Sequence, residues 1–108
     1  MDFLFFIADA PDPEPASETD AVDWAGEMDA RGVRLYGDRL RPADDATVVK
    51  VRGGETVTSS GSIAGDRDWI AGFDVIRCAD MDEAVRIASR HPMARAGQIE
   101  IRPVWPFE

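Results

Sequence analysis

The first third of the chain predicts an apolar strand, an extended connector and an amphipathic helix. Residues Phe3–Ala8 are apolar at both parities, which is typical of a strand covered on both faces. Proline then recurs at every second position from Pro11 to Pro15, so the connector is neither helix nor central strand. Ser17 or Thr19 can cap the helix that follows. Its apolar stripe falls on Ala21, Trp24, Ala25 and Met28, with Gly32 just past its end.

The middle of the chain predicts a second strand and then a hairpin. Residues Val33–Leu40 form the strand, followed by a turn. Two alternating runs, Thr47–Arg52 and Glu55–Thr58, flank Gly53-Gly54, and two glycines in this place are typical of a tight hairpin turn. Residues Ser59–Asp66 are small and polar, which predicts a loop of the kind that often carries function.

The last third again predicts a strand, a helix and a strand. Residues Trp69–Cys78 form an apolar run, in which Trp69 and Phe73 are expected to be core residues. Asp80 with Glu83 is a capping box, and it starts a helix that runs to His91. The expected buried stripe of this helix is Met81, Ala84, Val85 and Ala88, and the final strand is Gly97–Val104.

The order of these elements predicts the fold. A chain of 108 residues has room for one domain, which spans residues 1–108. We expect an α+β fold: a ferredoxin-like plait with an inserted β-hairpin, with its helices on one face of an antiparallel sheet. The other face also needs a cover, because doubly apolar strands would leave a larger exposed patch than soluble monomers tolerate. This predicts a homodimer.

Charge and composition narrow the classes of function. The 21 acidic and 12 basic residues give a formal charge of −9, which repels phosphate backbones, so nucleic acid is not an expected partner. The single Cys78 cannot form an internal disulfide, which fits a cytoplasmic protein. The apolar start lacks the positive region and the length of a signal peptide, and no membrane partner is expected. No motif indicates a metal or a cofactor.

Six features between about Ala30 and Trp105 resemble the YCII-related proteins, in particular their DGPF branch. They are Gly37-Asp38-Arg39-Leu40, Thr47–Arg52, the hairpin, Gly72-Phe73, Asp82-Glu83-Ala84 and Glu100–Val104. The resemblance implies a dimeric α/β barrel, in which two sheets pack face to face. The Asp-Gly-Pro-Phe motif of the branch falls on residues 60–63, where only the glycine remains. The resemblance also implies a His/Asp pair with the histidine near the first helix, but His91 is the only histidine here.

Three titratable residues are candidates for catalysis. Asp38 ends the second strand and matches an acidic position of the DGPF branch, so it can be a general base or, alternatively, a solvated turn residue. Asp74 interrupts an apolar strand, where an unpaired carboxylate is costly, so we expect an arginine partner, either Arg102 or Arg39. His91 either titrates near neutral pH in a site or caps the helix as a cation.

Four further residues are candidates for substrate binding. Glu100 and Arg102 share the face of the last strand that points away from the helices, where they can bind a small polar ligand or form a structural ion pair. Arg39 lies at the rim of the same expected cleft. Ser60 lies in the polar loop, where it can donate to a ligand or stay solvated. With Asp38 and Asp74, these residues are expected around a pocket between the sheet and the hairpin.

Two classes of function fit these residues. The first is a small-molecule-binding or regulatory accessory domain with a small polar ligand or a protein partner, because proteins of the DGPF type are often encoded beside extracytoplasmic-function sigma factors. The second is a cofactor-free acid/base enzyme, a lyase or isomerase acting on a small polar or aromatic substrate, since one branch of the YCII proteins includes a dehydrochlorinase. The missing motif acid and the missing first-helix histidine favour the first class.

Overall fold

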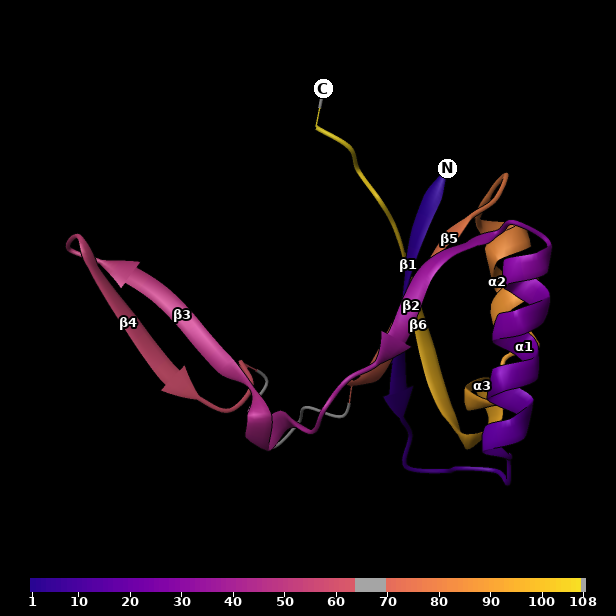
Figure 1. The fold of residues 1–108 in the computed structure, drawn as a ribbon, viewed down its shortest axis with the longest axis horizontal. Coiled ribbons are helices and arrows are strands. Elements are labelled where there is room, and N and C mark those ends of the chain that lie inside the picture. Colours follow the sequence, from indigo (N-terminus) through magenta and orange to yellow (C-terminus); the bar gives the residue numbers. More distant parts are fainter. Residues whose placement is uncertain (64–69, 108) are drawn as a thin grey trace.

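The computed structural model describes residues 1–63 and 70–107. Helices lie against one face of a four-stranded antiparallel sheet, and a two-stranded hairpin stands away from the opposite face (Figure 1). This α+β arrangement is compatible with the predicted ferredoxin-like plait. None of the described helices combines the length and the apolar character needed to cross a membrane.

The sheet contains, in spatial order, β2 (Arg34–Arg39), β5 (Ile70–Arg77), β1 (Asp2–Asp9) and β6 (Gly97–Pro103). Neighbouring strands are antiparallel throughout. Each strand-helix-strand unit therefore steps over one intervening strand, as the plait requires. All four strands occur where the sequence predicts them, except that Trp69, expected in β5, lies outside the described residues.

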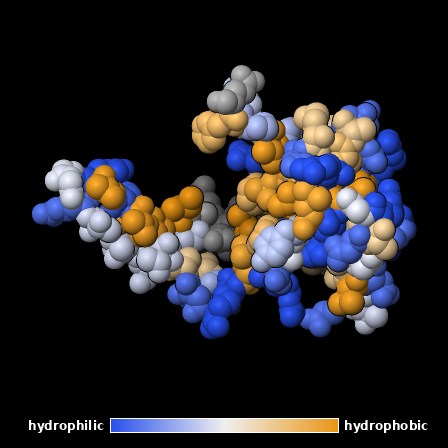
Figure 2. Space-filling view, turned by 45° about the horizontal axis from the view of Figure 1, so that its top comes forward, coloured by the Kyte–Doolittle hydropathy of each residue, from blue (hydrophilic) through white to orange (hydrophobic). Residues whose placement is uncertain are grey.

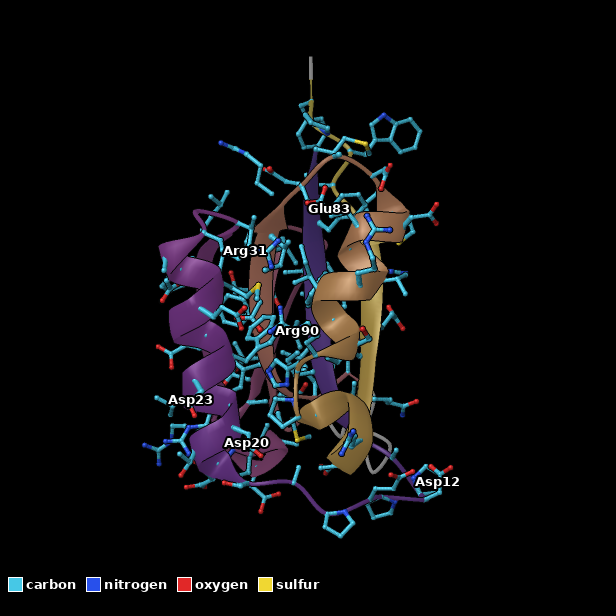
Figure 3. All side chains as sticks on the ribbon, turned by 90° about the vertical axis from the view of Figure 1, so that its right-hand side faces the viewer. Asp12, Asp20, Asp23, Arg31, Glu83 and Arg90 are labelled. Atoms are coloured by element: carbon cyan, nitrogen blue, oxygen red, sulfur yellow. The ribbon has the colours of Figure 1, made fainter. Side chains whose placement is uncertain are left out.

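The two main helices, α1 (Glu18–Ala30) and α2 (Met81–Ser89), lie side by side over the sheet (Figure 3). Ser17 caps α1, since its hydroxyl oxygen accepts a hydrogen bond from the Thr19 amide at 3.1 Å. One half of the predicted capping box of α2 is confirmed, because the Asp80 carboxylate accepts from the Glu83 amide at 2.9 Å. The Glu83 carboxylate accepts from the Ala79 amide at 2.8 Å, one residue before the expected donor. A short helix, α3 (Met93–Ala96), leads into β6.

The hydrophobic core lies between the sheet and the helices. Phe3, Phe5 and Ile7 of β1 are buried, in one cluster with Trp24 and Met28 of α1. From α2 the buried residues are Ala84, Ile87 and Ala88. The predicted stripe of this helix is therefore wrong at Met81 and Val85, which are 37% and 51% exposed.

The segment between β2 and β5 forms a separate sheet. A single 3-10 turn, η1 (Ala43–Asp45), leads into β3 (Thr47–Arg52) and β4 (Glu55–Ser60). Gly53 and Gly54 have φ angles of 58° and 79°, the left-handed pair that a tight primed turn requires, so the predicted hairpin is confirmed. Residues 59 and 60, predicted in a loop, belong to β4, and the loop positions 64–66 lie outside the described residues.

The sheet face that points away from the helices carries an apolar patch that is only partly buried. On it, Leu4 and Phe6 of β1 lie opposite Val75 and Phe73 of β5. Phe73, predicted as a core residue, is thus on this open face instead. Figure 2 shows hydrophobic side chains gathered on the side of the body that is turned toward the hairpin.

Candidate functional site

A cavity of about 470 Å³ opens at the end of the helical layer where α1 begins. Its walls come from the first half of α1, from the adjoining ends of β2 and β5, and from the segment 91–96 around α3. Most of the lining is apolar. The polar and charged residues that line it are Ser17, Glu18, Arg34, Asp38, Arg39, Asp74 and His91.

An ion pair between Arg34 and Asp74 is the most enclosed pair of charges in this wall. Arg34 Nε donates to Asp74 Oδ1 at 2.7 Å, and the two side chains are 17% and 7% exposed. Arg34 Nη1 also binds the Asp29 carboxylate of α1, at 3.1 and 3.2 Å, and Nη2 donates to the Gly37 carbonyl at 2.8 Å. The guanidinium is therefore held by two carboxylates and a backbone carbonyl.

Asp74 has an arginine partner, as its apolar surroundings predict, but the partner is neither Arg102 nor Arg39. Burial raises the pKa of Asp74, and the hydrogen bond from Arg34 opposes that rise. A register shift between Arg34 and Tyr36 explains the wrong prediction. It places Arg34 opposite Ile76, on the helix-bearing face, whereas unbroken alternation would have placed it on the open face.

Gly37 leaves room for the Asp74 carboxylate. The two residues are partners in the β2–β5 ladder. A Cβ atom added to Gly37 would collide with Asp74 Oδ1 and lie 2.7 Å from the Phe73 carbonyl oxygen. The ion pair therefore depends on a residue without a side chain at this position.

His91 forms another part of the cavity wall, beyond the end of α2. Its Nδ1 accepts a hydrogen bond from the Met93 amide at 2.9 Å, so the neutral ring carries its proton on Nε2. The ring centroid lies 4.5 Å from that of Trp24, and the residue is 8% exposed. Burial, followed by the charge of Arg34, lowers the pKa of His91 to about 4. His91 is uncharged at neutral pH, so it is neither the cationic helix cap nor the group titrating near neutral pH that the sequence predicted.

Asp38, Arg39 and Glu18 lie at the exposed mouth of the cavity. Arg39 Nη1 is 3.8 Å from Glu18 Oε1, which brings β2 and the start of α1 together there. Asp38 Oδ1 accepts a hydrogen bond from the Arg39 amide at 2.9 Å. Asp38 forms no salt bridge with any residue in the described ranges.

The family model of the YCII-related domain matches the whole chain, residues 1–108. The chain belongs to the YCII-related family. A protein of Rhizobium meliloti (strain 1021), named Uncharacterized protein R00369, is 34% identical to this YCII-related chain over 68 residues. The match covers 61% of this chain and 55% of that curated relative, so it spans about half of the relative's length.

Three residues predicted for the site of this YCII-related protein do not line the cavity. Arg102 Nε lies 3.2 Å from Glu100 Oε2, and both side chains are largely exposed on the open face of the sheet, the face predicted for them. Ser60 is exposed at the end of β4, opposite Thr47. The cavity lies on the helix-bearing side of the sheet and not between the sheet and the hairpin.

Arg34 and Trp24 are among the lining residues of this YCII-related chain that the sequence did not indicate as site residues. Arg34 holds Asp74, and Trp24 packs against His91 while its indole N–H donates to the Ile87 carbonyl at 3.0 Å. The available signal for Arg34 was a charged residue between the apolar residues Val33 and Leu35 at the start of the strand. Over residues 1–63 and 70–107, no group of three or more His, Cys, Asp and Glu side chains is placed to hold a metal ion.

Proposed function

We propose that this member of the YCII-related family is a homodimeric, cytoplasmic small-molecule-binding domain that holds its ligand in the cavity beside Arg34 and Asp74. The cavity itself carries the proposal. Its volume of about 470 Å³ is typical of ligand pockets, which measure roughly 300–1,000 Å³, and its wall combines apolar side chains with a few polar groups. Such a domain can act as a sensor that passes the presence of a ligand to a protein partner.

Acid/base catalysis is the second candidate, and one residue favours it. Asp38 is at the rim of the cavity, is exposed, and has no salt bridge with a described residue. Its ladder partner is Phe73 of the open face, so its carboxylate would have to turn into the cavity mouth to act as the general base of a cofactor-free lyase or isomerase. The other two candidates suit this chemistry less well. Asp74 Oδ1 is occupied by Arg34, and Nε2 of His91 already carries the proton of a neutral ring.

The open face of the sheet supports the homodimer. Leu4, Phe6, Phe73 and Val75 stay partly exposed there, and the same face of a second copy would cover them. Persistent homodimers bury roughly 2,000 Å² or more in total. We expect light scattering at micromolar concentration to give the mass of two chains, and the mass of one chain would contradict the dimer.

Filling the cavity tests the binding function. Ala21 lines the cavity, so Ala21→Phe would occupy part of its volume, whereas Ala30→Phe places the same ring at the exposed end of the same helix. A fragment library screened by NMR of the labelled full chain is expected to shift the amide signals of Gly72 and Ala96. These shifts are expected to disappear in Ala21→Phe and to persist in Ala30→Phe.

Asp38→Asn separates the two candidate functions. In a binding domain this change leaves the bound fragments chemically unaltered, as they are with the native chain. In an enzyme, substrates among the fragments are consumed by the native chain, and Asp38→Asn abolishes turnover while binding is retained. A library in which no fragment shifts the signals of the cavity wall would refute the binding function.

A further inference from the structure

The polar groups of the cavity are divided between a closed end and an open end. Arg34, Asp74 and His91 are buried or nearly so, with Asp74 5% and His91 8% exposed. Arg39 and Glu18 at the mouth have side chains that are 89% and 94% exposed. The closed end, whose charged and polar side chains are largely shielded from solvent, decides which ligand charge the cavity accepts, because charges at the mouth stay screened by solvent.

Among residues 1–63 and 70–107, the closed end offers an anionic group no free positive charge. Arg34 is the one cation of these residues that lines this end, and its guanidinium already binds the carboxylates of Asp74 and Asp29 and the carbonyl of Gly37. Two carboxylates thus surround one guanidinium, in a chain whose formal charge is −9. Burial of an anion at this end is therefore not compensated.

A cationic group is disfavoured by the same surroundings, as the lowered pKa of His91 indicates. A proton added to its ring is opposed first by burial and then by repulsion from Arg34, which together lower the pKa of His91 to about 4. A ligand ammonium group placed against this ring would meet both effects. The closed end therefore favours ligands that carry no charge.

His91 also supplies a hydrogen-bond donor for which the described residues offer no acceptor. Nδ1 is occupied by the Met93 amide, so the proton is on Nε2, and the indole N–H of the neighbouring Trp24 is already bound to the Ile87 carbonyl. Throughout the described residues, every fully enclosed side-chain nitrogen or oxygen has a hydrogen-bond partner. Nε2 has none among them, so it is not fully enclosed, and His91 is part of the cavity wall.

We propose that the cavity binds an uncharged ligand with a hydroxyl or carbonyl oxygen on an apolar body, and that His91 Nε2–H donates to this oxygen. The proposal rests on the binding function proposed above. The apolar wall, which includes Ala21, Trp24 and Met93, buries the body of the ligand. The Nε2–H group then makes the polar contact that separates an alcohol or carbonyl compound from a hydrocarbon of the same size.

Four probes of nearly equal size and different charge test the ligand class. They are benzyl alcohol, benzoate, benzylamine and toluene, each titrated into the labelled full chain at pH 7.5 and followed by NMR. We expect benzyl alcohol to bind roughly 3- to 10-fold more tightly than toluene, as one hydrogen bond allows, and benzoate and benzylamine to bind more weakly than either. The shifts are expected at Gly72 and Ala96 of the cavity wall.

Two substitutions of His91 test its role. His91→Phe keeps a ring against Trp24 and removes the N–H, so the preference for benzyl alcohol over toluene is expected to disappear while toluene binds as before. His91→Gln restores an N–H donor near the position of Nε2, and the preference is expected to return in part. Thermal unfolding of each variant shows whether a loss of affinity comes from misfolding. The ratio of the affinities for benzyl alcohol and toluene, measured on the same variant, does not depend on the fraction that is folded.

Several results would overturn the proposal, and they differ from the result that would refute the binding function. Tightest binding of benzoate or benzylamine, or a preference for benzyl alcohol that survives His91→Phe, would show that the ligand class or the donor is wrong while binding stands. Shifts confined to Asp20 and Ser89 would do the same, because these residues line a second groove on the outer side of His91. If neither the probes nor any library fragment binds, the binding function itself falls.

Discussion

The buried ion pair should respond very differently to removal of its two members. Arg34→Met leaves the Asp74 carboxylate, 5% exposed, without a counter-charge. Leaving one partner of a buried pair uncompensated costs about 3–5 kcal/mol of unfolding free energy. Asp74→Asn leaves Arg34 still bound to Asp29 and to the Gly37 carbonyl, so the loss is that of one charged hydrogen bond, about 1.5–3 kcal/mol.

The pair of Arg77 and Asp2 is a matched control, because its N···O distance is also 2.7 Å while its side chains are 62% and 30% exposed. Arg77→Met is expected to cost much less unfolding free energy than Arg34→Met, because a solvent-exposed ion pair contributes little to stability. The double variant Arg34→Met/Asp74→Leu removes both buried charges, so it is expected to recover most of the stability lost in Arg34→Met.

Urea unfolding at one fixed protein concentration measures these differences, since a dimer would make stability depend on concentration. The deficit of Arg34→Met should also shrink from pH 7 to pH 5. Without Arg34, burial raises the pKa of Asp74 further, and a carboxyl group whose pKa is higher in the folded chain gains stability as pH falls. If Arg34→Met cost no more than Arg77→Met, the pair would not be buried as described.

Three further changes test other parts of the structure. Gly37→Ala is expected to lower the free energy of unfolding by about 2–4 kcal/mol, measured by calorimetry. Gly26→Ala is the control and should raise it slightly, because a Cβ atom at Gly26 meets nothing within 4 Å. Equal effects of the two substitutions would contradict the close approach at Gly37. The pKa of His91 is 6.5 in the unfolded chain and about 4 in the folded chain, so between pH 6.5 and pH 4 the imidazole is protonated mainly in the unfolded chain. The free energy of unfolding should therefore drop by about 2–3 kcal/mol from pH 6.5 to pH 4. His91→Phe should lack this component, and an unchanged pH profile would show that the ring is not buried. Asp80→Ala removes the cap of α2 and should cost about 0.5–2 kcal/mol in urea unfolding; no loss would mean that the bond to the Glu83 amide is absent in solution.

Local patterns were sufficient to predict the six described strands, the two main helices and their order, but not the short helix α3. Gly53-Gly54 specified the hairpin, and Asp80 with Glu83 specified the start of α2, because each signal depends only on a few neighbouring residues. The stripe of α2 was less determined. Ala84 and Ala88 fit an apolar stripe with Val85 and also one with Ile87, and helical periodicity alone does not distinguish the two. Packing against the sheet decides between them, and it buries Ile87 and leaves Val85 exposed.

The site was harder to predict because it depends on register and on distant contacts. The partner of Asp74 is set by the register shift after Arg34, which alternation along one strand does not reveal. The charge of His91 is set by Trp24 and Arg34, which are remote in sequence. A histidine before a proline at a helix end looks like a cap, and only the packing of α1 over it makes it a buried, neutral group.

The way in which the hairpin is attached to the sheet should allow insertions and deletions in the segment that contains it. Arg39 pairs with Gly72, and the Leu40 amide donates to the Ala71 carbonyl at 2.8 Å. The end of β2 and the start of β5 therefore lie side by side, as they would if a short turn joined them. Residues 41–69 are an excursion from that turn. Closing so long a loop costs only about 1.8 kcal/mol more than closing one of four residues. Related chains can therefore lengthen, shorten or exchange this excursion, and an engineered binding segment can be grafted there, while the paired strands keep the plait in register.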